Sequence, residues 1–111
     1  MKIKIIWSED AANELAEIIL YIKKNSNKIT AKNFHEKIMS KVRDASENIK
    51  GRKTAPLLKE FGIIDVYQIN INPWAIYYKA ENNFMKLIAI IDLRRNSEEI
   101  LYQKIMEEKI K

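Results

Sequence analysis

The sequence predicts an α+β fold in which a helical hairpin packs on a small, mainly antiparallel sheet, in the order β-α-α-β-β-β-α. Two stretches with apolar residues at helical spacing follow each other at residues 9–22 and 30–49. Three strand-like stretches then occupy residues 67–72, 74–79 and 84–93, with turn-forming residues between them. A chain of 111 residues without cysteine fits a single domain, which needs no disulfide to stabilise its core.

The N-terminal part is expected to form one strand followed by two antiparallel helices. In residues 2–7, Ile3, Ile5 and Trp7 fall on one face and Lys2, Lys4 and Ile6 on the other, a pattern typical of a half-buried strand. Ser8 follows as a helix N-cap, ahead of two acidic residues that the helix dipole favours. The second helix has the more regular apolar stripe, formed by Ala31, Phe34, Ile38, Val42, Ala45 and Ile49. Gly51 is expected to end this helix in a left-handed conformation.

The second half of the chain is expected to be mostly strand. Residues 50–62 are predicted to form a loop, because glycine and proline interrupt any pattern there. The stretch at 84–93 is apolar on both sides, as expected of a central strand, and a hairpin loop at 81–83 leads into it. Asn96 is expected to cap a last helix, whose residues 104–111 are predicted to fray.

The composition excludes several classes of enzyme site. The chain has no cysteine and a single histidine, His35, so thiolate metal centres and Ser-His-Asp chemistry are not expected. Two glycines leave no loop that could cradle a nucleotide phosphate. We therefore expect neither a cofactor nor a bound metal.

The charge is uneven along the chain. Residues 1–62 hold 13 Lys and Arg against 8 Asp and Glu, which accounts for the whole net charge of +5. This indicates an acidic partner, either nucleic acid or an acidic protein, unless the lysines only form a solvated surface. The longest apolar run, 87–91, is far too short to cross a membrane, and no secretory signal is visible. We expect a cytoplasmic protein without membrane contact.

Several short strings carry a resemblance to a known family. In order they are residues 6–11 (IWSEDA), 15–18 (LAEI), 18–22 (IILYI), 31–34 (AKNF), 50–53 (KGRK), 66–70 (VYQIN), 76–79 (IYYK) and 90–96 (IIDLRRN). Their order and spacing over residues 3–102 resemble the RelE/ParE toxin superfamily of bacterial type II toxin–antitoxin systems.

The resemblance implies a small cytoplasmic toxin of a plasmid-stabilisation or growth-inhibition system. Such toxins are neutralised by a cognate antitoxin, which wraps them in a toxin–antitoxin hetero-oligomer. RelE-like members cleave mRNA in the ribosomal A site, whereas ParE-like members poison DNA gyrase and are not nucleases.

The residues on the open face of the sheet favour the ParE-like branch. Where cleaving members carry lysines and an arginine, this sequence has Gln68, Asn70 and Ala75. Neutral side chains cannot offset the charge that a phosphodiester gathers during cleavage. If the chain is nevertheless a nuclease, the cations left for catalysis are Arg94, Arg95 and Lys53, without a metal. A third alternative is an inactive homologue that only binds its antitoxin.

Two surfaces are candidates for binding partners. The expected target-binding residues are Arg52, Lys53, Gln68, Asn70, Tyr77, Arg94 and Arg95. Strand parity assigns Trp7, Trp74 and Tyr78 to the core, and Tyr77 on the opposite parity is expected to be exposed. Arg94 and Arg95 are called the twin arginines below. The alternative to a binding role for them is a structural ion pair with Asp92 or Glu98. Excess apolar character on the helical hairpin predicts an antitoxin-binding groove formed by Ile19, Leu20, Tyr21 and Met39.

Overall fold

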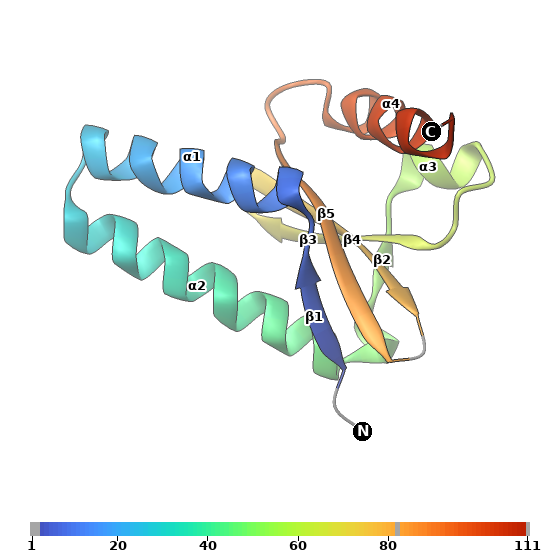
Figure 1. Cartoon of the computed structure of the whole chain (residues 1–111), viewed down its shortest axis with the longest axis horizontal. Coiled ribbons are helices and arrows are strands. Elements are labelled where there is room, and N and C mark those ends of the chain that lie inside the picture. The colour runs from blue at the N-terminus through green and yellow to red at the C-terminus, as the bar shows by residue number, and fades with distance from the viewer. Residues whose placement is uncertain (1–2, 82, 111) are drawn as a thin grey trace.

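The computed structural model describes residues 3–81 and 83–110, and it consists of one five-stranded sheet with helices on both faces (Figure 1). The elements in chain order are β1 (Lys4–Trp7), α1 (Glu9–Asn25), α2 (Lys28–Glu47), the 3₁₀ turn η1 (Ile49–Gly51), β2 (Lys53–Thr54), α3 (Pro56–Glu60), β3 (Val66–Ile71), β4 (Trp74–Glu81), β5 (Phe84–Asp92) and α4 (Ser97–Ile110).

The sheet has the strand order β1-β5-β4-β3-β2. Only β1 and β5 run parallel, and the other neighbours are antiparallel, so the predicted α+β architecture with a mainly antiparallel sheet is confirmed. The predicted loop at 50–62 also contains β2 and α3. These elements were missed because two and five residues are too short to show a period.

The sheet is buried on both faces rather than on one. The helical hairpin of α1 and α2 covers a cluster that includes Leu15, Ile38, Val42, Ile76, Tyr78 and Leu87. On the opposite face, α3 and α4 cover a second cluster that includes Leu58, Val66, Ala75, Tyr77, Ile88 and Leu101. In Figure 1 the two helical layers lie on either side of the strands.

The expectation that Tyr77 is exposed is wrong. Its parity is indeed opposite to that of Tyr78, but the face it points to is covered by α3 and α4. The Tyr77 side chain has 0% exposure and lies among residues such as Leu58 and Leu101. Tyr77 therefore stabilises the second core and cannot touch a partner in this fold.

The ends of the helices follow local rules with a few differences from prediction. Ser8 caps α1 by accepting a hydrogen bond from the backbone N–H of Ala11 at 3.0 Å, as expected. Gly51 was expected to be left-handed, but it belongs to η1, and Gly62 instead has a φ of 79°.

The C-terminal helix and the β4–β5 hairpin also bear on the predictions. Helix α4 extends from Ser97 to Ile110, and the expectation that residues 104–111 fray stays a prediction. In the loop predicted at 81–83, Asn82 lies outside the described residues, as does Lys2 of the predicted first strand. No helix in the described part of the chain is both long and apolar enough to span a bilayer.

Candidate functional site

Four of the predicted target-binding residues line one cavity at the β2 edge of the sheet. Arg52, Lys53, Gln68 and Asn70 surround a volume of about 280 Å³, whose other wall is the C-terminal half of α2. We call this cavity the edge groove; its remaining lining residues are Lys41, Asp44, Ala45, Asn48, Gly51, Ile69 and Tyr78. The groove exists because β2 pairs with β3 only at Lys53↔Gln68 and Thr54↔Tyr67, which leaves the rest of the β3 edge without a described strand beside it.

Arg52 is held against two tyrosines at the base of the edge groove. Its guanidinium carbon lies 5.3 Å from the ring centroid of Tyr67, within cation–π range, and Tyr67 lies 5.5 Å from the ring of Tyr78. Burial raises the pKa of the Tyr78 hydroxyl, while the positive charge and a hydrogen bond from Arg52 act in the opposite direction. The Nε of Arg52 is buried and has no hydrogen-bond partner among the described residues.

The amide side chains of the edge groove are paired with each other. Nε2 of Gln68 donates to Oδ1 of Asn70 at 2.6 Å, and Nζ of Lys41 reaches the backbone carbonyl of Asn70 at 3.4 Å. The residue opposite Asn70 on β4 is Ala75, which is fully buried. The three positions that the resemblance aligns with cations of cleaving members thus carry two neutral amides and a covered methyl group.

The twin arginines lie elsewhere, just beyond the end of β5. Arg94 forms a two-pronged ion pair with Asp92, with Nε to Oδ1 at 3.0 Å and Nη2 to Oδ2 at 2.7 Å. These bonds, and one from the backbone N–H of Arg94, lower the pKa of Asp92 to about 2. The ion-pair alternative for Arg94 is thus confirmed, although its side chain remains 70% exposed.

Arg95 lines a separate cavity between α1 and α4, together with Glu14, Glu17, Trp74 and Asp92. That cavity shares no lining residue with the edge groove. The structure therefore does not bring Arg95 and Lys53 into one cavity, as a composite nuclease site would require.

The predicted antitoxin-binding residues divide into an exposed and a packed pair. Leu20 and Tyr21 are 64% and 60% exposed, whereas Ile19 and Met39 pack against the core under the hairpin. Ile29, at the start of α2, is 72% exposed and was missed because a lone apolar residue beside a turn gives no periodic signal.

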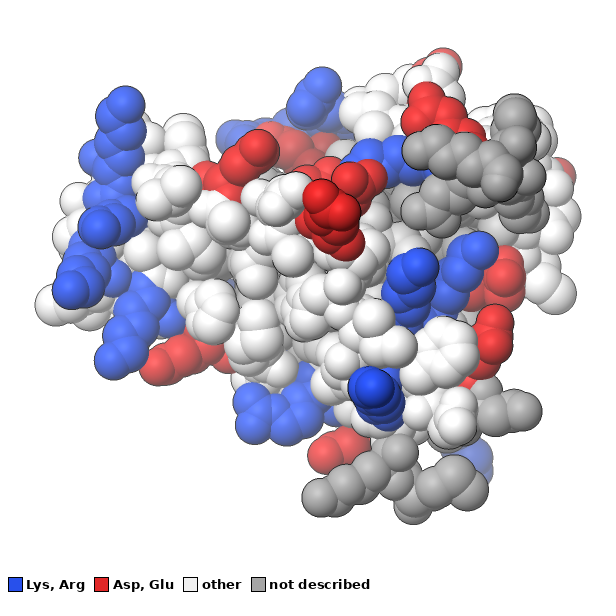
Figure 2. Space-filling model, in the orientation of Figure 1, with Lys and Arg blue, Asp and Glu red and all other residues white. Residues whose placement is uncertain are grey.

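Charges surround the exposed apolar residues of the hairpin. Figure 2 shows Lys and Arg side chains gathered over the closed end of the α1–α2 hairpin, at the left of the view. The hairpin carries Lys23 and Lys24 in the last turn of α1 and Lys28 as the first residue of α2. The pKa of the Arg94 guanidinium is raised mainly by its hydrogen bond and charge interaction with Asp92, and Tyr21 adds a smaller contribution. Sequence reasoning could not have joined Tyr21 and Arg94, which belong to distant segments.

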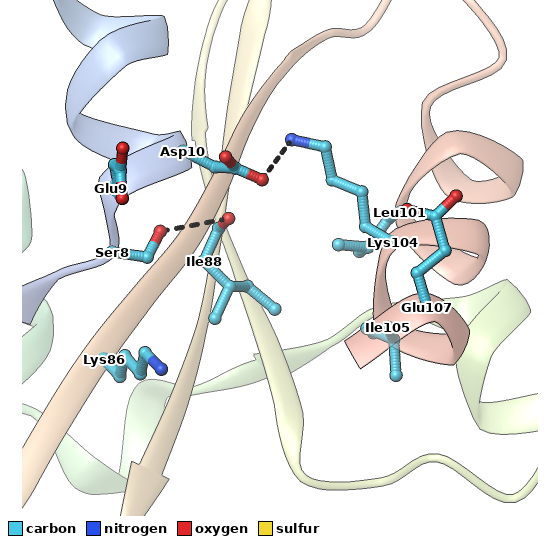
Figure 3. Close-up of a pocket in the computed structure, with 9 residues that line it drawn as sticks. All are labelled: Ser8, Glu9, Asp10, Lys86, Ile88, Leu101, Lys104, Ile105 and Glu107. Atoms are coloured by element: carbon cyan, nitrogen blue, oxygen red, sulfur yellow. Dashed lines mark hydrogen bonds and ion pairs between the residues drawn. The ribbon is translucent and has the colours of Figure 1, made fainter. Parts of the chain in front are cut away.

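Another cavity, of about 300 Å³, lies between the start of α1, β5 and α4 (Figure 3). Lys104 of α4 points towards α1 and forms ion pairs with Asp10 at 3.7 Å and Glu14 at 2.7 Å. Oγ of Ser8 donates to the carbonyl of Ile88 at 3.4 Å. These contacts join α1 to α4 and to the sheet. Within residues 3–81 and 83–110, no three His, Cys, Asp or Glu side chains are grouped so that they could hold a metal.

The helical hairpin on a mainly antiparallel sheet is the α+β architecture that the resemblance to the RelE/ParE superfamily implies. Residues 5–100 match the family described as "ParE toxin of type II toxin-antitoxin system, parDE", and the chain belongs to this family. Among solved structures, "Chromosomal ParDE TA system from P. aeruginosa" is similar in fold, with a TM-score of 0.65, 13% identity, and 81% of this chain and 95% of that chain covered. Among curated proteins, none matches this sequence.

Proposed function

We propose that this chain is a ParE-like toxin that restrains growth by binding a macromolecular target, DNA gyrase, and that a cognate antitoxin neutralises it in the cytoplasm. Membership of the ParE family supports the toxin class. The observation that carries the mechanism is the neutral character of the sheet at Gln68, Asn70 and the buried Ala75. Binding, rather than cleavage of RNA, is the activity that such a surface supports.

The energetics favour binding over catalysis. Cleavage of a phosphodiester by the ribose 2′-hydroxyl needs positive charge around the reacting phosphate, and each such contact contributes about 3 kcal/mol to the transition state. The charge of Arg94 is already partly offset by Asp92, and Lys53 lies in a different cavity from Arg95. The remaining cations are therefore too dispersed to replace the three that are missing.

The two candidate surfaces have different roles in this proposal. The edge groove and the exposed Arg94 and Arg95 bind the target. The exposed Leu20 and Tyr21, extended by Ile29, are offered to the antitoxin, with Ile19 and Met39 supporting them from below. An amphipathic partner helix can bury such an apolar surface while its acidic face meets the surrounding lysines.

The test is a supercoiling assay with purified gyrase, this protein and the antitoxin encoded beside it. We expect inhibition of supercoiling that the antitoxin relieves at a one-to-one ratio. A parallel translation reaction, in which mRNA ends are mapped, examines the alternatives. Codon-phased cuts would favour a RelE-like endoribonuclease, and silence in both assays would favour a homologue that only binds its antitoxin.

A further inference from the structure

We propose that the edge groove is a carboxylate-binding site in which Arg52 receives an Asp or Glu side chain from an acidic segment of the antitoxin. The inference rests on the proposed function, because it takes the antitoxin as the partner. It adds a second point of contact for the antitoxin, at the opposite end of α2 from the exposed apolar residues of the hairpin. Because the proposed function offers the same groove to the target, antitoxin and target compete for it.

The first argument is the state of the Arg52 guanidinium. One of its faces is covered by Tyr67, its Nε is buried without a hydrogen-bond partner, and it takes part in none of the ion pairs among the described residues. A partly buried cation without a counterion is unfavourable, and a carboxylate that accepts from it gains a charge-assisted hydrogen bond. Among the described residues, the Arg52 guanidinium therefore has an unused donor and no counterion within ion-pair distance.

The second argument is the shape of the groove. Its volume of about 280 Å³ accommodates one or two side chains. Beyond Gln68 the edge of β3 has no described strand beside it, so an extended segment can lie along that edge. Lys41 and Lys53 flank the entrance, and the Lys41 ammonium makes only a long bond of 3.4 Å to Asn70. The cavity that such a segment enters is lined by three cations, Lys41, Arg52 and Lys53, and by one carboxylate, Asp44.

A peptide carboxylate fits better than a nucleic acid. The phosphate backbone repeats its charge every few ångströms and needs a row of cations. Asp44 lines this groove and repels any anion, so it disfavours a continuous row of phosphates more than a single carboxylate. Arg52 also occupies the face of Tyr67 on which a base would stack. The excess positive charge of the chain lies wholly in residues 1–62, which include α2 and β2 on either side of the groove.

The test measures the affinity of the intact chain for the antitoxin encoded beside it, by calorimetry. Arg52→Gln is expected to weaken binding ~10–100-fold, the range for loss of a charge-assisted hydrogen bond. Arg52→Lys keeps the charge without the fork of donors, and an intermediate affinity is expected. Lys59→Gln, which removes the same charge from the exposed surface of α3, is the matched control and is expected to stay within about 3-fold.

Two further measurements separate contact from structural support. Asn70→Asp places a carboxylate at the exposed rim without disturbing the tyrosines, and it is expected to weaken binding while the melting temperature is unchanged. In ¹⁵N spectra of arginine side chains, the Nε–H signal of Arg52 is expected to shift when the antitoxin is added. A purely structural Arg52 would not respond in this way.

The possible outcomes are distinct. If the antitoxin binds the wild type, Arg52→Gln and Asn70→Asp equally, the groove inference is wrong and the proposed function stands. If the antitoxin does not bind the wild type, both are wrong. If Arg52→Gln abolishes binding of a fluorescent single-stranded RNA but leaves the antitoxin affinity unchanged, the groove takes phosphate and the inference is overturned.

Discussion

The carboxylate of Glu14 accepts a hydrogen bond from the backbone N–H of Ile90 at 2.9 Å, across 76 positions of sequence. The pairing of β1 with β5 ends at Trp7↔Leu87, so the β5 edge beyond that point has no described strand beside it. Glu14 supplies the missing acceptor from α1, and its second oxygen accepts from Lys104 of α4 at 2.7 Å. One side chain thus joins the hairpin, the sheet and the C-terminal helix.

We expect Glu14→Ala to lower the free energy of unfolding by about 1–3 kcal/mol, because it leaves the part-buried N–H of Ile90 without its acceptor and leaves the Lys104 ammonium with only its longer ion pair to Asp10. Glu14→Gln retains an oxygen for Ile90 and should cost less. Urea unfolding measures both. Glu17→Ala, an exposed change on the same helix, is the control, and an equal loss there would contradict the role given to Glu14.

The ion pair between Asp92 and Arg94 predicts an acid-dependent contribution to stability. The pKa of Asp92 is lowered from 3.8 to about 2, mainly by the hydrogen bond from Arg94, so the folded state holds the proton less tightly than the unfolded state. The contribution is therefore fully present above the unfolded pKa and is lost as the pH falls through about 2.

Asp92→Asn removes this titration. We expect the difference in unfolding free energy between the wild type and Asp92→Asn to be constant near neutral pH and to shrink steadily below about pH 4. Urea titrations across the acid range measure it. A difference that stays the same down to the lowest pH would mean that the pair does not form in solution.

The buried position of Tyr77 predicts a large cost for its removal. Tyr77→Ala should destabilise the fold by about 3–5 kcal/mol, as expected for deleting a buried aromatic side chain. Tyr21→Ala, at an exposed position, should change stability by less than about 0.5 kcal/mol. Chemical denaturation measures the unfolding free energy of both variants. Similar small losses for the two would mean that the Tyr77 side chain is exposed.

The exposed residues of the hairpin predict a separation of binding from stability. Leu20→Ala is expected to weaken antitoxin binding by ~10-fold or more, which corresponds to a hot-spot contact, with an unchanged melting temperature. Met39→Ala should affect both quantities, because Met39 packs against the core. Ile64→Ala, exposed in the segment before β3, is the control. If Leu20→Ala and the wild type bind the antitoxin with equal affinity, the hairpin is not part of the interface.

Local signals in the sequence were enough for the main elements of the fold. The capping role of Ser8 and the apolar stripe through Ile38 and Val42 depend on neighbours a few residues apart, so they could be predicted from the printed chain. The strands β3, β4 and β5 likewise show in alternation and apolar runs. The short β2 and α3 show no period and could not be predicted in this way.

The candidate site was less accessible to prediction because it depends on tertiary register. The parity of Tyr77 was predicted correctly, but which face α3 and α4 would cover was not visible in either helix alone. The contact of Arg52 with Tyr67 follows from the two-residue pairing of β2 with β3, which no local pattern indicates. The bond from Ile90 to Glu14 has no sequence signal at all.

The most direct test of the central claim is a map of mRNA ends in a reconstituted translation reaction with excess purified protein. The neutral sheet face at Gln68, Asn70 and Ala75 predicts that the protein adds no codon-phased ends. Codon-phased ends that disappear when Arg94 and Arg95 are both replaced by glutamine would contradict it and assign the protein to the ribonucleases.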